Sequence, residues 1–223
     1  MNDQPANGFD FSVPSAATIA PAIDTLFFTL VALCLLVTLA VGCTIVYFCI
    51  RYRAASKAGR ENAPSNRRGL EYTWIGVPIL LFFGIFVWSA ILFVRIYTPP
   101  PNALDIFVVG KQWMWKIEHK SGRQEINEVH VPLGVPVRLV MTSQDVIHAF
   151  FVPAFRLKQD VLPGRYSALW FQATKLGVYP LSCSEFCGTD HSRMGGTVIV
   201  MTPEDYERWA SEKPSAVEET PKP

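Results

Sequence analysis

The segment from Cys183 to Met194 carries four side chains of types that bind soft metal ions. Cys187 follows Cys183 by four positions, His191 follows Cys187 by four, and Met194 lies three positions further on. Thiolate, imidazole and thioether ligands together favour copper over hard cations, which prefer oxygen. A mononuclear blue-copper site uses a single thiolate with two histidines and a weak methionine, so the second thiolate here allows two sulfurs to bridge two metal ions. The segment therefore predicts a dinuclear copper site.

A second imidazole is available from His148, which ends the sequence Asp145-Val146-Ile147-His148 upstream of the cysteines. We expect a strand to deliver this side chain to the cysteine loop. Rigidly held ligands let a dinuclear copper centre take up and release one electron, so the set predicts electron transfer. A histidine on an apolar strand can also be a hydrogen-bonded core residue, and this alternative stays open.

The cysteines and Met194 also have structural interpretations. Cys183 and Cys187 could form a disulfide within a loop, and Met194 could fill core space. A disulfide would not explain why His191 and Met194 follow at ligand spacing. Copper is therefore the preferred prediction.

Two long apolar runs precede this part of the chain, at 25–50 and 74–94. Each is longer than the roughly 20 residues that a helix needs to cross about 30 Å of hydrocarbon. Neither run has a polar face, so we expect a transmembrane helical hairpin rather than core helices. A cleaved signal peptide is disfavoured, because residues 1–21 contain no Lys or Arg. Three cysteines lie in the first run and are expected to pack as small apolar residues: Cys34, Cys43 and Cys49.

The loop between the apolar runs indicates the orientation of the hairpin. It holds six basic residues against one acid, Glu61. The positive-inside rule places such a loop in the cytoplasm. Both termini and the residues after Tyr97 are then expected on the periplasmic side of a bacterial inner membrane. The basic residues are Arg51, Arg53, Lys57, Arg60, Arg67 and Arg68.

The 223 residues leave room for this anchor and one domain of about 100–150 residues. We expect an extracytoplasmic lead-in over 1–23, the hairpin over 24–97 and a copper-binding domain over 98–202. The remainder, 203–223, is expected to form a short helix and a disordered tail. The net charge of +1 says nothing about a nucleic-acid partner, but no basic cluster is interleaved with aromatics, and no such partner is expected.

Short apolar segments bounded by Gly, Pro, Asn and Ser follow one another from Leu104 onward and are typical of strands. Their number and spacing predict an all-β sandwich or barrel of the cupredoxin-like, Greek-key type, with the metal ligands on loops at one end. The predicted strands are Leu104–Val109, Trp113–Glu118, Glu128–Val131, Val135–Thr142, Ala149–Val152, Arg165–Gln172, Gly177–Cys183 and Gly195–Val200.

Over nearly its whole length the chain resembles subunit II of the haem-copper cytochrome c oxidases. The resemblance is carried by the motif Cys-Ser-Glu-x-Cys-Gly-x-x-His-x-x-Met at 183–194, by Gln112-Trp113-Met114-Trp115 and by Pro163-Gly164-Arg165. It implies a subunit that accepts electrons from cytochrome c or another cytochrome at a copper A centre. These electrons would pass to haem in subunit I, where oxygen is reduced to water with proton pumping. The implied partners are subunits I and III and the lipid membrane.

The resemblance also implies a role for each residue of the motif. The implied copper ligands are His148, Cys183, Glu185, Cys187, His191 and Met194. Both cysteines would bridge the two copper ions, His148 and Met194 would complete one copper, and His191 with the backbone carbonyl of Glu185 would complete the other. The Glu185 side chain would bind a magnesium ion shared with subunit I, since carboxylates suit hard cations.

Two further roles follow from the resemblance. Trp113 would receive electrons from cytochrome c, and Glu71 would lie at the mouth of a proton-uptake channel. Trp113 could equally be a core aromatic, and Glu71 an acid stabilised at a helix N-terminus. The segment 116–128 mixes basic and acidic residues, which predicts weaker steering of a basic donor than a uniformly acidic face would give. His119 and His130 are expected to be surface or strand residues and are given no role.

The main alternative is a membrane-anchored copper chaperone or thiol reductase, which also carries Cys-x-x-x-Cys and a histidine. Such proteins place their histidine after the cysteines, need one anchor helix, and lack the positions of Glu185 and Met194. A nitrous oxide reductase would need a large soluble catalytic domain, and quinol oxidase subunits lose the copper ligands. The oxidase subunit is therefore the prediction.

Overall fold

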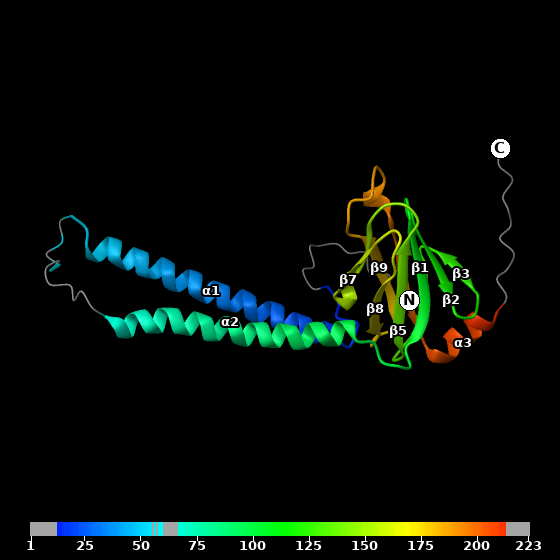
Figure 1. The fold of residues 1–223 in the computed structure, drawn as a ribbon, viewed down its shortest axis with the longest axis horizontal. Coiled ribbons are helices and arrows are strands. Elements are labelled where there is room, and N and C mark those ends of the chain that lie inside the picture. The colour runs from blue at the N-terminus through cyan, green and yellow to red at the C-terminus, as the bar shows by residue number, and fades with distance from the viewer. Residues whose placement is uncertain (1–12, 55, 57, 60–66, 213–223) are drawn as a thin grey trace. The chain divides into compact units, whose positions relative to one another are not determined.

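The computed structural model describes residues 13–54, 56, 58–59 and 67–212. The chain divides into two compact units (Figure 1). One spans Ala22–Phe93, and the other joins the segment before Ala22 to the residues from Val94 onward. The tail expected at 213–223, the first twelve residues and the loop residues Lys57, Arg60 and Glu61 lie outside the described residues.

The helical unit consists of two long helices, α1 (Ala20–Arg51) and α2 (Arg68–Tyr97). Both are long and apolar enough to cross a membrane, and their most apolar windows are 0% and 6% buried. Side chains such as Leu80, which is 73% exposed, would be unstable in water but suit hydrocarbon. The predicted pair of apolar helices is confirmed. The three cysteines of α1 are exposed rather than packed against protein.

In the described part of the chain, ten strands form a β-domain of two sheets. The first sheet has the order β3-β2-β1-β5-β8, and the second has the order β4-β10-β9-β6-β7. The strands of the first are β1 (Leu104–Lys111), β2 (Met114–His119), β3 (Gln124–Ile126), β5 (Pro136–Ser143) and β8 (Ser167–Gln172). Those of the second are β4 (Glu128–Pro132), β6 (His148–Val152), β7 (Leu157–Val161), β9 (Gly177–Cys183) and β10 (Gly195–Met201).

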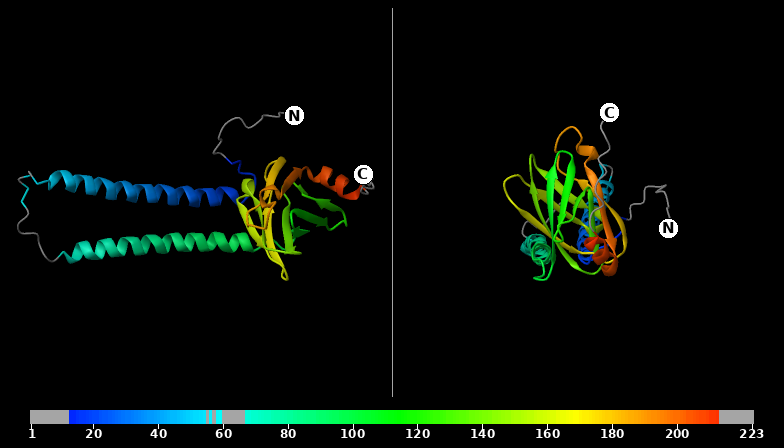
Figure 2. Two further views of the ribbon diagram at one scale, coloured as in Figure 1. Left: turned by 90° about the horizontal axis from the view of Figure 1, so that it is seen from above. Right: turned by 90° about the vertical axis from the view of Figure 1, so that its right-hand side faces the viewer.

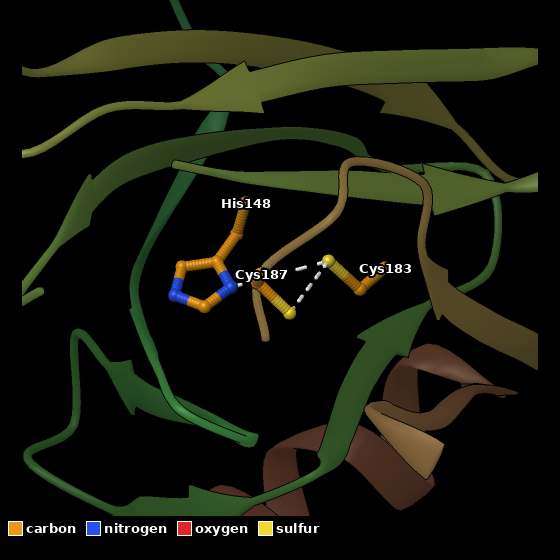
Figure 3. A group of neighbouring side chains, drawn as sticks. All are labelled: His148, Cys183 and Cys187. Atoms are coloured by element: carbon orange, nitrogen blue, oxygen red, sulfur yellow. Dashed lines mark hydrogen bonds between the residues drawn. The ribbon is translucent and has the colours of Figure 1, made fainter. Parts of the chain in front are cut away.

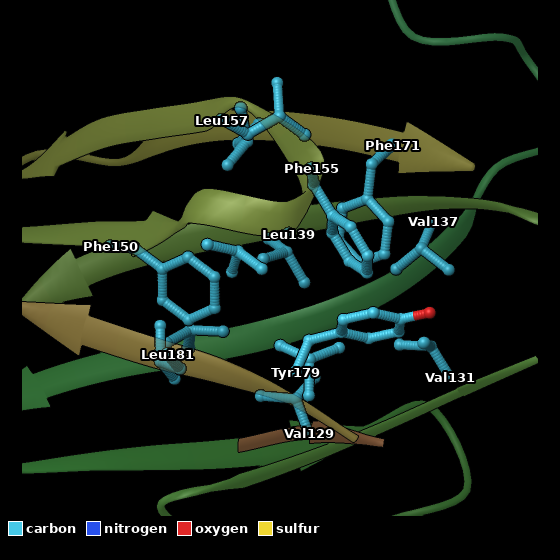
Figure 4. Close-up of a cluster of buried hydrophobic side chains, with 14 of the residues drawn as sticks. Val129, Val131, Val137, Leu139, Phe150, Phe155, Leu157, Phe171, Tyr179 and Leu181 are labelled. Carbon is cyan, nitrogen blue, oxygen red and sulfur yellow. The ribbon is translucent and has the colours of Figure 1, made fainter. Parts of the chain in front are cut away.

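The two sheets face one another across an apolar core (Figures 2 and 4). Most pairs are antiparallel, while β1 with β5 and β4 with β10 are parallel. Alternate side chains of β5, Val137, Leu139 and Met141, are completely buried, as the two-residue period of a strand requires. Opposite them the second sheet contributes Phe150 and Leu181. The predicted all-β sandwich is confirmed.

The eight predicted strands all occur, with ends shifted by up to two residues. Two strands, β3 and β7, were not predicted. β3 has only three residues, and two of them are polar. β7 reads Leu-Lys-Gln-Asp-Val, so its polar centre hides the buried side chains at its two ends. Both lie at the edge of a sheet, where one side of the strand has no neighbour and polar residues are tolerated.

A segment before α1 is part of the β-domain. Ala16 and Ala17 are 0% and 1% exposed and belong to the apolar core. The Ala16 N–H donates to the Ala154 carbonyl at 3.0 Å, and the Thr174 N–H donates to the Ala16 carbonyl at 2.9 Å. The segment is irregular, as expected of a lead-in, but it closes one part of the core.

After β10 the chain forms the short helix α3 (Pro203–Ser211), within the segment 203–223 where a short helix was expected. Thr202 caps its N-terminus, because the Thr202 hydroxyl accepts a hydrogen bond from the Asp205 N–H at 3.2 Å. The helix contacts β4.

Replacing Ala16 by Glu should destabilise the β-domain, because it forces a carboxyl group into a core that has no space or partner for it. We expect a loss of about 3 kcal/mol or more. Thermal unfolding of the full-length chain in detergent, followed by near-ultraviolet circular dichroism, measures the effect. Thr18→Glu is the control, since Thr18 is exposed on the same segment. Equal stability of the two variants would contradict this docking of the segment.

Candidate metal centre

The predicted ligands meet at one end of the second sheet. His148 is the first residue of β6, and Cys183 is the last residue of β9. The two strands are neighbours, with Phe150 opposite Cys183, and the Ser184 N–H donates to the Ala149 carbonyl at 3.0 Å. The other ligands lie on the loop that follows β9, which includes the short 3-10 helix η2 (His191–Arg193).

Figure 3 shows His148, Cys183 and Cys187 pointing toward one another. The two sulfur atoms are 3.8 Å apart, whereas a disulfide bond measures about 2.05 Å. Both cysteines are free, so the disulfide alternative does not describe this structure. The His148 Nδ1 atom lies 3.9 Å from the Cys183 sulfur.

The remaining donor atoms surround the same pair of sulfurs. The Cys187 sulfur is 3.4 Å from His191 Nδ1 and 3.6 Å from the Met194 sulfur. The backbone carbonyl oxygen of Glu185 is 3.3 Å from the Cys183 sulfur. The structure thus brings together all six residues that the sequence singled out as copper ligands.

Most of this centre is closed to water. His148 is 0% exposed, Cys187 and Met194 are 2% exposed, and Cys183 is 8% exposed. Burial, together with the adjacent Cys183 sulfur, raises the pKa of the Cys187 thiol to about 12. A thiolate at this position therefore needs a cation beside it, since metal binding displaces the proton.

Asp145 fixes the orientation of His148. Its Oδ1 atom lies 2.8 Å from His148 Nε2, so the ring donates there and leaves the Nδ1 lone pair facing Cys183. Burial alone would raise the pKa of Asp145, but the hydrogen bonds from the Gln112 N–H, the His148 ring and the Val146 N–H lower it to about 2. Asp145 is therefore ionised at neutral pH. A carboxylate behind a ligating histidine is a common support of metal sites.

Gln112 ties the two ligand-bearing loops together. Its backbone N–H donates to Asp145 Oδ2 at 2.7 Å, and its side-chain Nε2 donates to the Cys187 carbonyl at 2.7 Å. Sequence analysis assigned no positioning role to Gln112 or Asp145. The available signals were an acid three positions before His148 and the place of Gln112 beside Trp113.

Trp113 packs on the loop that carries Cys187. Gly188, the residue after Cys187, has a φ of 121°. A β-carbon on Gly188 would lie 3.3 Å from the Trp113 ring and 2.9 Å from Gln112 Nε2. Gly188 thus allows the half-buried indole to approach the backbone beside Cys187. Trp115 is a core aromatic, 0% exposed, with its ring centre 5.9 Å from that of His148.

Two exposed apolar side chains are next to the candidate ligands in the chain. Phe186, between the two cysteines, is 77% exposed, and Ile147, beside His148, is 45% exposed. Glu185 is also exposed. Glu71 belongs to the helical unit, where it is exposed in the first turn of α2.

The donor set fits copper. Two thiols, two imidazoles and a thioether are soft or borderline ligands, and the single carbonyl oxygen suits a weak position. Oxygen-only cations such as Mg²⁺ and Ca²⁺ have no comparable set here. The cluster His148, Cys183 and Cys187 is also compact, with its ligand atoms within 4.8 Å of one another.

Comparison with known proteins identifies relatives of this chain. A family model described as "Cytochrome C oxidase subunit II, periplasmic domain" matches residues 123–202. Cytochrome c oxidase subunit 2 of Thermostichus vulcanus is 30% identical, over 87% of this chain and 76% of the relative. The alternative cytochrome c oxidase subunit 2 of Bradyrhizobium diazoefficiens is 29% identical, over 74% of this chain and 71% of the relative. The solved periplasmic domain of subunit II of the cytochrome oxidase of Bradyrhizobium japonicum is 34% identical, covers 51% of this chain and 94% of that domain, and has a TM-score of 0.49.

The similarity to the Thermostichus vulcanus subunit extends over 87% of this chain, which is more than the β-domain alone spans. The long apolar helices, the β-sandwich and the cluster of soft ligands fit the same family. The chain belongs to the cytochrome c oxidase subunit II family and is a subunit of that oxidase.

Proposed function

We propose that the chain is the electron-accepting subunit of a respiratory cytochrome c oxidase. Cytochrome c or another cytochrome would donate electrons, and haem in subunit I would receive them for the reduction of oxygen to water with proton pumping. The convergence of two free thiols, two imidazoles, a thioether and a carbonyl in a nearly dry pocket carries this proposal. A dinuclear copper A centre bound there would supply reversible one-electron chemistry.

The ligand side chains of the site are held in place by their neighbours, which would favour rapid electron transfer. His148 is fixed between Asp145 and the core ring of Trp115. Cys187 is fixed through its carbonyl by Gln112. Because few donor atoms are free to move, little rearrangement would accompany a change in charge at the centre.

Trp113 is the proposed point where electrons enter. Its ring packs against Gly188, one residue from Cys187, and Gln112 connects the same strand end to the Cys187 carbonyl. The exposed apolar side chains Phe186 and Ile147 provide a surface on which a donor protein can dock.

Three further proposals rest on the family. The exposed Glu185 would offer its carboxylate to a magnesium ion shared with subunit I, and Glu71 would serve at the proton-uptake entrance. Subunit III would complete the complex. The two helices would anchor the chain in the bacterial inner membrane, with the β-domain and both termini in the periplasm. The division into 1–23, 24–97, 98–202 and 203–223 stays a prediction.

Copper content tests the proposed function. The full-length chain, purified in detergent and loaded with copper, should hold two copper ions that share one unpaired electron in the electron paramagnetic resonance spectrum. Cys187→Ser should abolish that signal, because one bridging sulfur is lost. Cys43→Ser, an exposed cysteine of α1, is the matched control and should keep it. A single labile copper in the unmodified chain would favour the chaperone alternative.

Asp145→Asn should weaken copper binding by about 10–100-fold, since the amide no longer holds the His148 ring with a negative charge. Copper retention against a chelator measures the loss, and the hyperfine pattern reports the altered ligand. Asp190→Asn is the control, because Asp190 lies on the same loop as Cys187 and its carboxylate makes an ion pair with Arg193, at 3.8 Å, rather than with a proposed ligand. If both variants retained copper equally, Asp145 would have no positioning role.

Trp113→Phe should slow reduction of the assembled oxidase by cytochrome c about tenfold or more, equivalent to about 1.4 kcal/mol in the barrier. The copper spectrum should stay unchanged, because Trp113 is not a ligand. Stopped-flow kinetics measures the rate. Trp170→Phe, the same change at a tryptophan whose indole donates to the Arg95 carbonyl at 3.0 Å, is the control. An unchanged rate in Trp113→Phe would place electron uptake elsewhere.

A further inference from the structure

A second group of metal-binding side-chain types lies where the chain crosses from the first sheet to the second. Glu125 is in β3, and Glu128 and His130 are in β4. Asn127 makes the crossing with φ of 61°. One donor atom from each of Glu125, Glu128 and His130 lies within 4.8 Å of the others. The proposed function uses none of these residues.

The Glu125 carboxylate is the centre of this group. Its Oε2 atom is 2.9 Å from His119 Nε2, and its Oε1 atom is 2.6 Å from His130 Nδ1. Burial would raise the pKa of Glu125, but the neighbouring His119 and His130 rings outweigh burial and lower the pKa to about 2. The group is therefore a carboxylate at neutral pH, with its side chain 9% exposed.

His130 Nδ1 lies 2.6 Å from Glu125 Oε1, but the two groups are not aligned as a hydrogen bond requires. The atom is buried and has no hydrogen-bond partner in the part of the chain that the structure describes. A buried nitrogen and a carboxylate oxygen are both satisfied when they bind one cation. In a tetrahedral zinc site with metal–ligand distances of about 2.1 Å, adjacent donor atoms are about 3.4 Å apart, so Glu125 Oε1 and His130 Nδ1, now 2.6 Å apart, would move apart by less than about 1 Å to admit the cation.

Glu125 has the support typical of a metal-binding carboxylate. His119 holds it from behind, and the other His119 nitrogen, Nδ1, lies 3.2 Å from the Tyr206 hydroxyl of α3. His119 is 2% exposed. Such outer hydrogen bonds orient a ligand and maintain its charge.

Trp209 of α3 covers the group. Its ring stacks on His130 with centres 4.4 Å apart and an angle of 22° between the planes. The Arg123 guanidinium lies 4.2 Å from the centre of the Trp209 ring. Glu128 is exposed, so the group is open to solvent at this residue.

We propose that Glu125, Glu128 and His130 bind one divalent cation of the borderline class, for which Zn²⁺ is the probe. Two carboxylates and an imidazole without sulfur suit Zn²⁺, whereas Mg²⁺ and Ca²⁺ prefer oxygen alone. The cation would fasten β3 to β4, and through His130 and Trp209 it would also steady α3. This site is separate from the copper ligands and does not rest on the proposed function.

Isothermal titration of the copper-loaded, full-length chain with zinc tests the site. We expect one zinc ion per chain and a loss of affinity of at least tenfold in both Glu128→Gln and His130→Ala. Because Glu128 is exposed, Glu128→Gln should fold normally. Glu118→Gln makes the same change of charge at an exposed acid of β2 and should leave the affinity unchanged. The absence of zinc binding, or equal affinity in all variants, would overturn the proposal.

X-ray absorption at the zinc edge identifies the donors. Nitrogen and oxygen at about 2.0–2.1 Å support the site, whereas sulfur at about 2.3 Å would place the zinc at the cysteines and overturn it. The double variant Cys183→Ser, Cys187→Ser removes both thiols of the proposed copper centre. Zinc binding by this variant tests the second site whether or not the first one holds copper.

Discussion

The proposed copper ligand set depends on the pairing of β6 with β9. His148 and Cys183 are 35 residues apart in the chain, and only the register that places Phe150 opposite Cys183 brings their side chains together. The Ser184 N–H, bonded to the Ala149 carbonyl, extends that pairing by one step and sets the direction in which the loop leaves the sheet. A shift of one residue would turn His148 to the opposite face of its strand, because successive side chains alternate. The ligand geometry is therefore a consequence of strand register, and the core that fixes the register is part of the site.

The first sheet contributes no proposed copper ligand, yet its residues hold the proposed copper ligands of the second sheet in place. Gln112 follows β1 and Asp145 follows β5, and because these two strands are parallel, both supporting residues lie beyond the same end of the first sheet. Asp145 holds His148 from one side, and Gln112 holds the Cys187 carbonyl from the other. Gly110, also in β1, leaves room for this contact, since a β-carbon there would lie 2.9 Å from the His148 ring. The second sheet and the loop after β9 thus carry the proposed copper ligands, and residues that follow strands of the first sheet restrict the motion of these ligands.

The sequence predicts a functional site best where its residues are close together in the chain. Cys183, Cys187, His191 and Met194 lie on one loop, so their spacing alone predicted a shared metal site, and the long apolar runs were equally plain. Contacts between distant segments left no such signal. Asp145 and Gln112 meet across 33 positions, and nothing in either residue type marks the contact. The buried segment at Ala16 has no strand-like alternation, because alanines with little side chain can enter a core without a pattern. His119 was expected to be a surface or strand residue, and its sequence neighbours do not indicate its contact with Tyr206 of α3, which lies 87 positions later.

The two groups of donor atoms differ in a way that bears on metal selection. Three of the six proposed copper donors are sulfur atoms, and all three sulfurs are buried, whereas the Glu125 group contains oxygen and nitrogen and opens to solvent through Glu128. Affinity alone would let copper compete for both, because copper(II) binds most nitrogen and oxygen sites more tightly than zinc does. Softness separates them more effectively, since copper(I) favours thiolate and thioether over carboxylate. A chain that receives its copper in the reduced state would therefore fill the sulfur site and leave the carboxylates for a harder ion.

Each group of donor atoms also contains a hydrogen bond between a histidine and a carboxylate, His148 with Asp145 and His119 with Glu125. In the first pair the imidazole is the proposed metal ligand, and in the second pair the carboxylate is. The same pair of side-chain types can thus support soft or hard chemistry, and its orientation decides which.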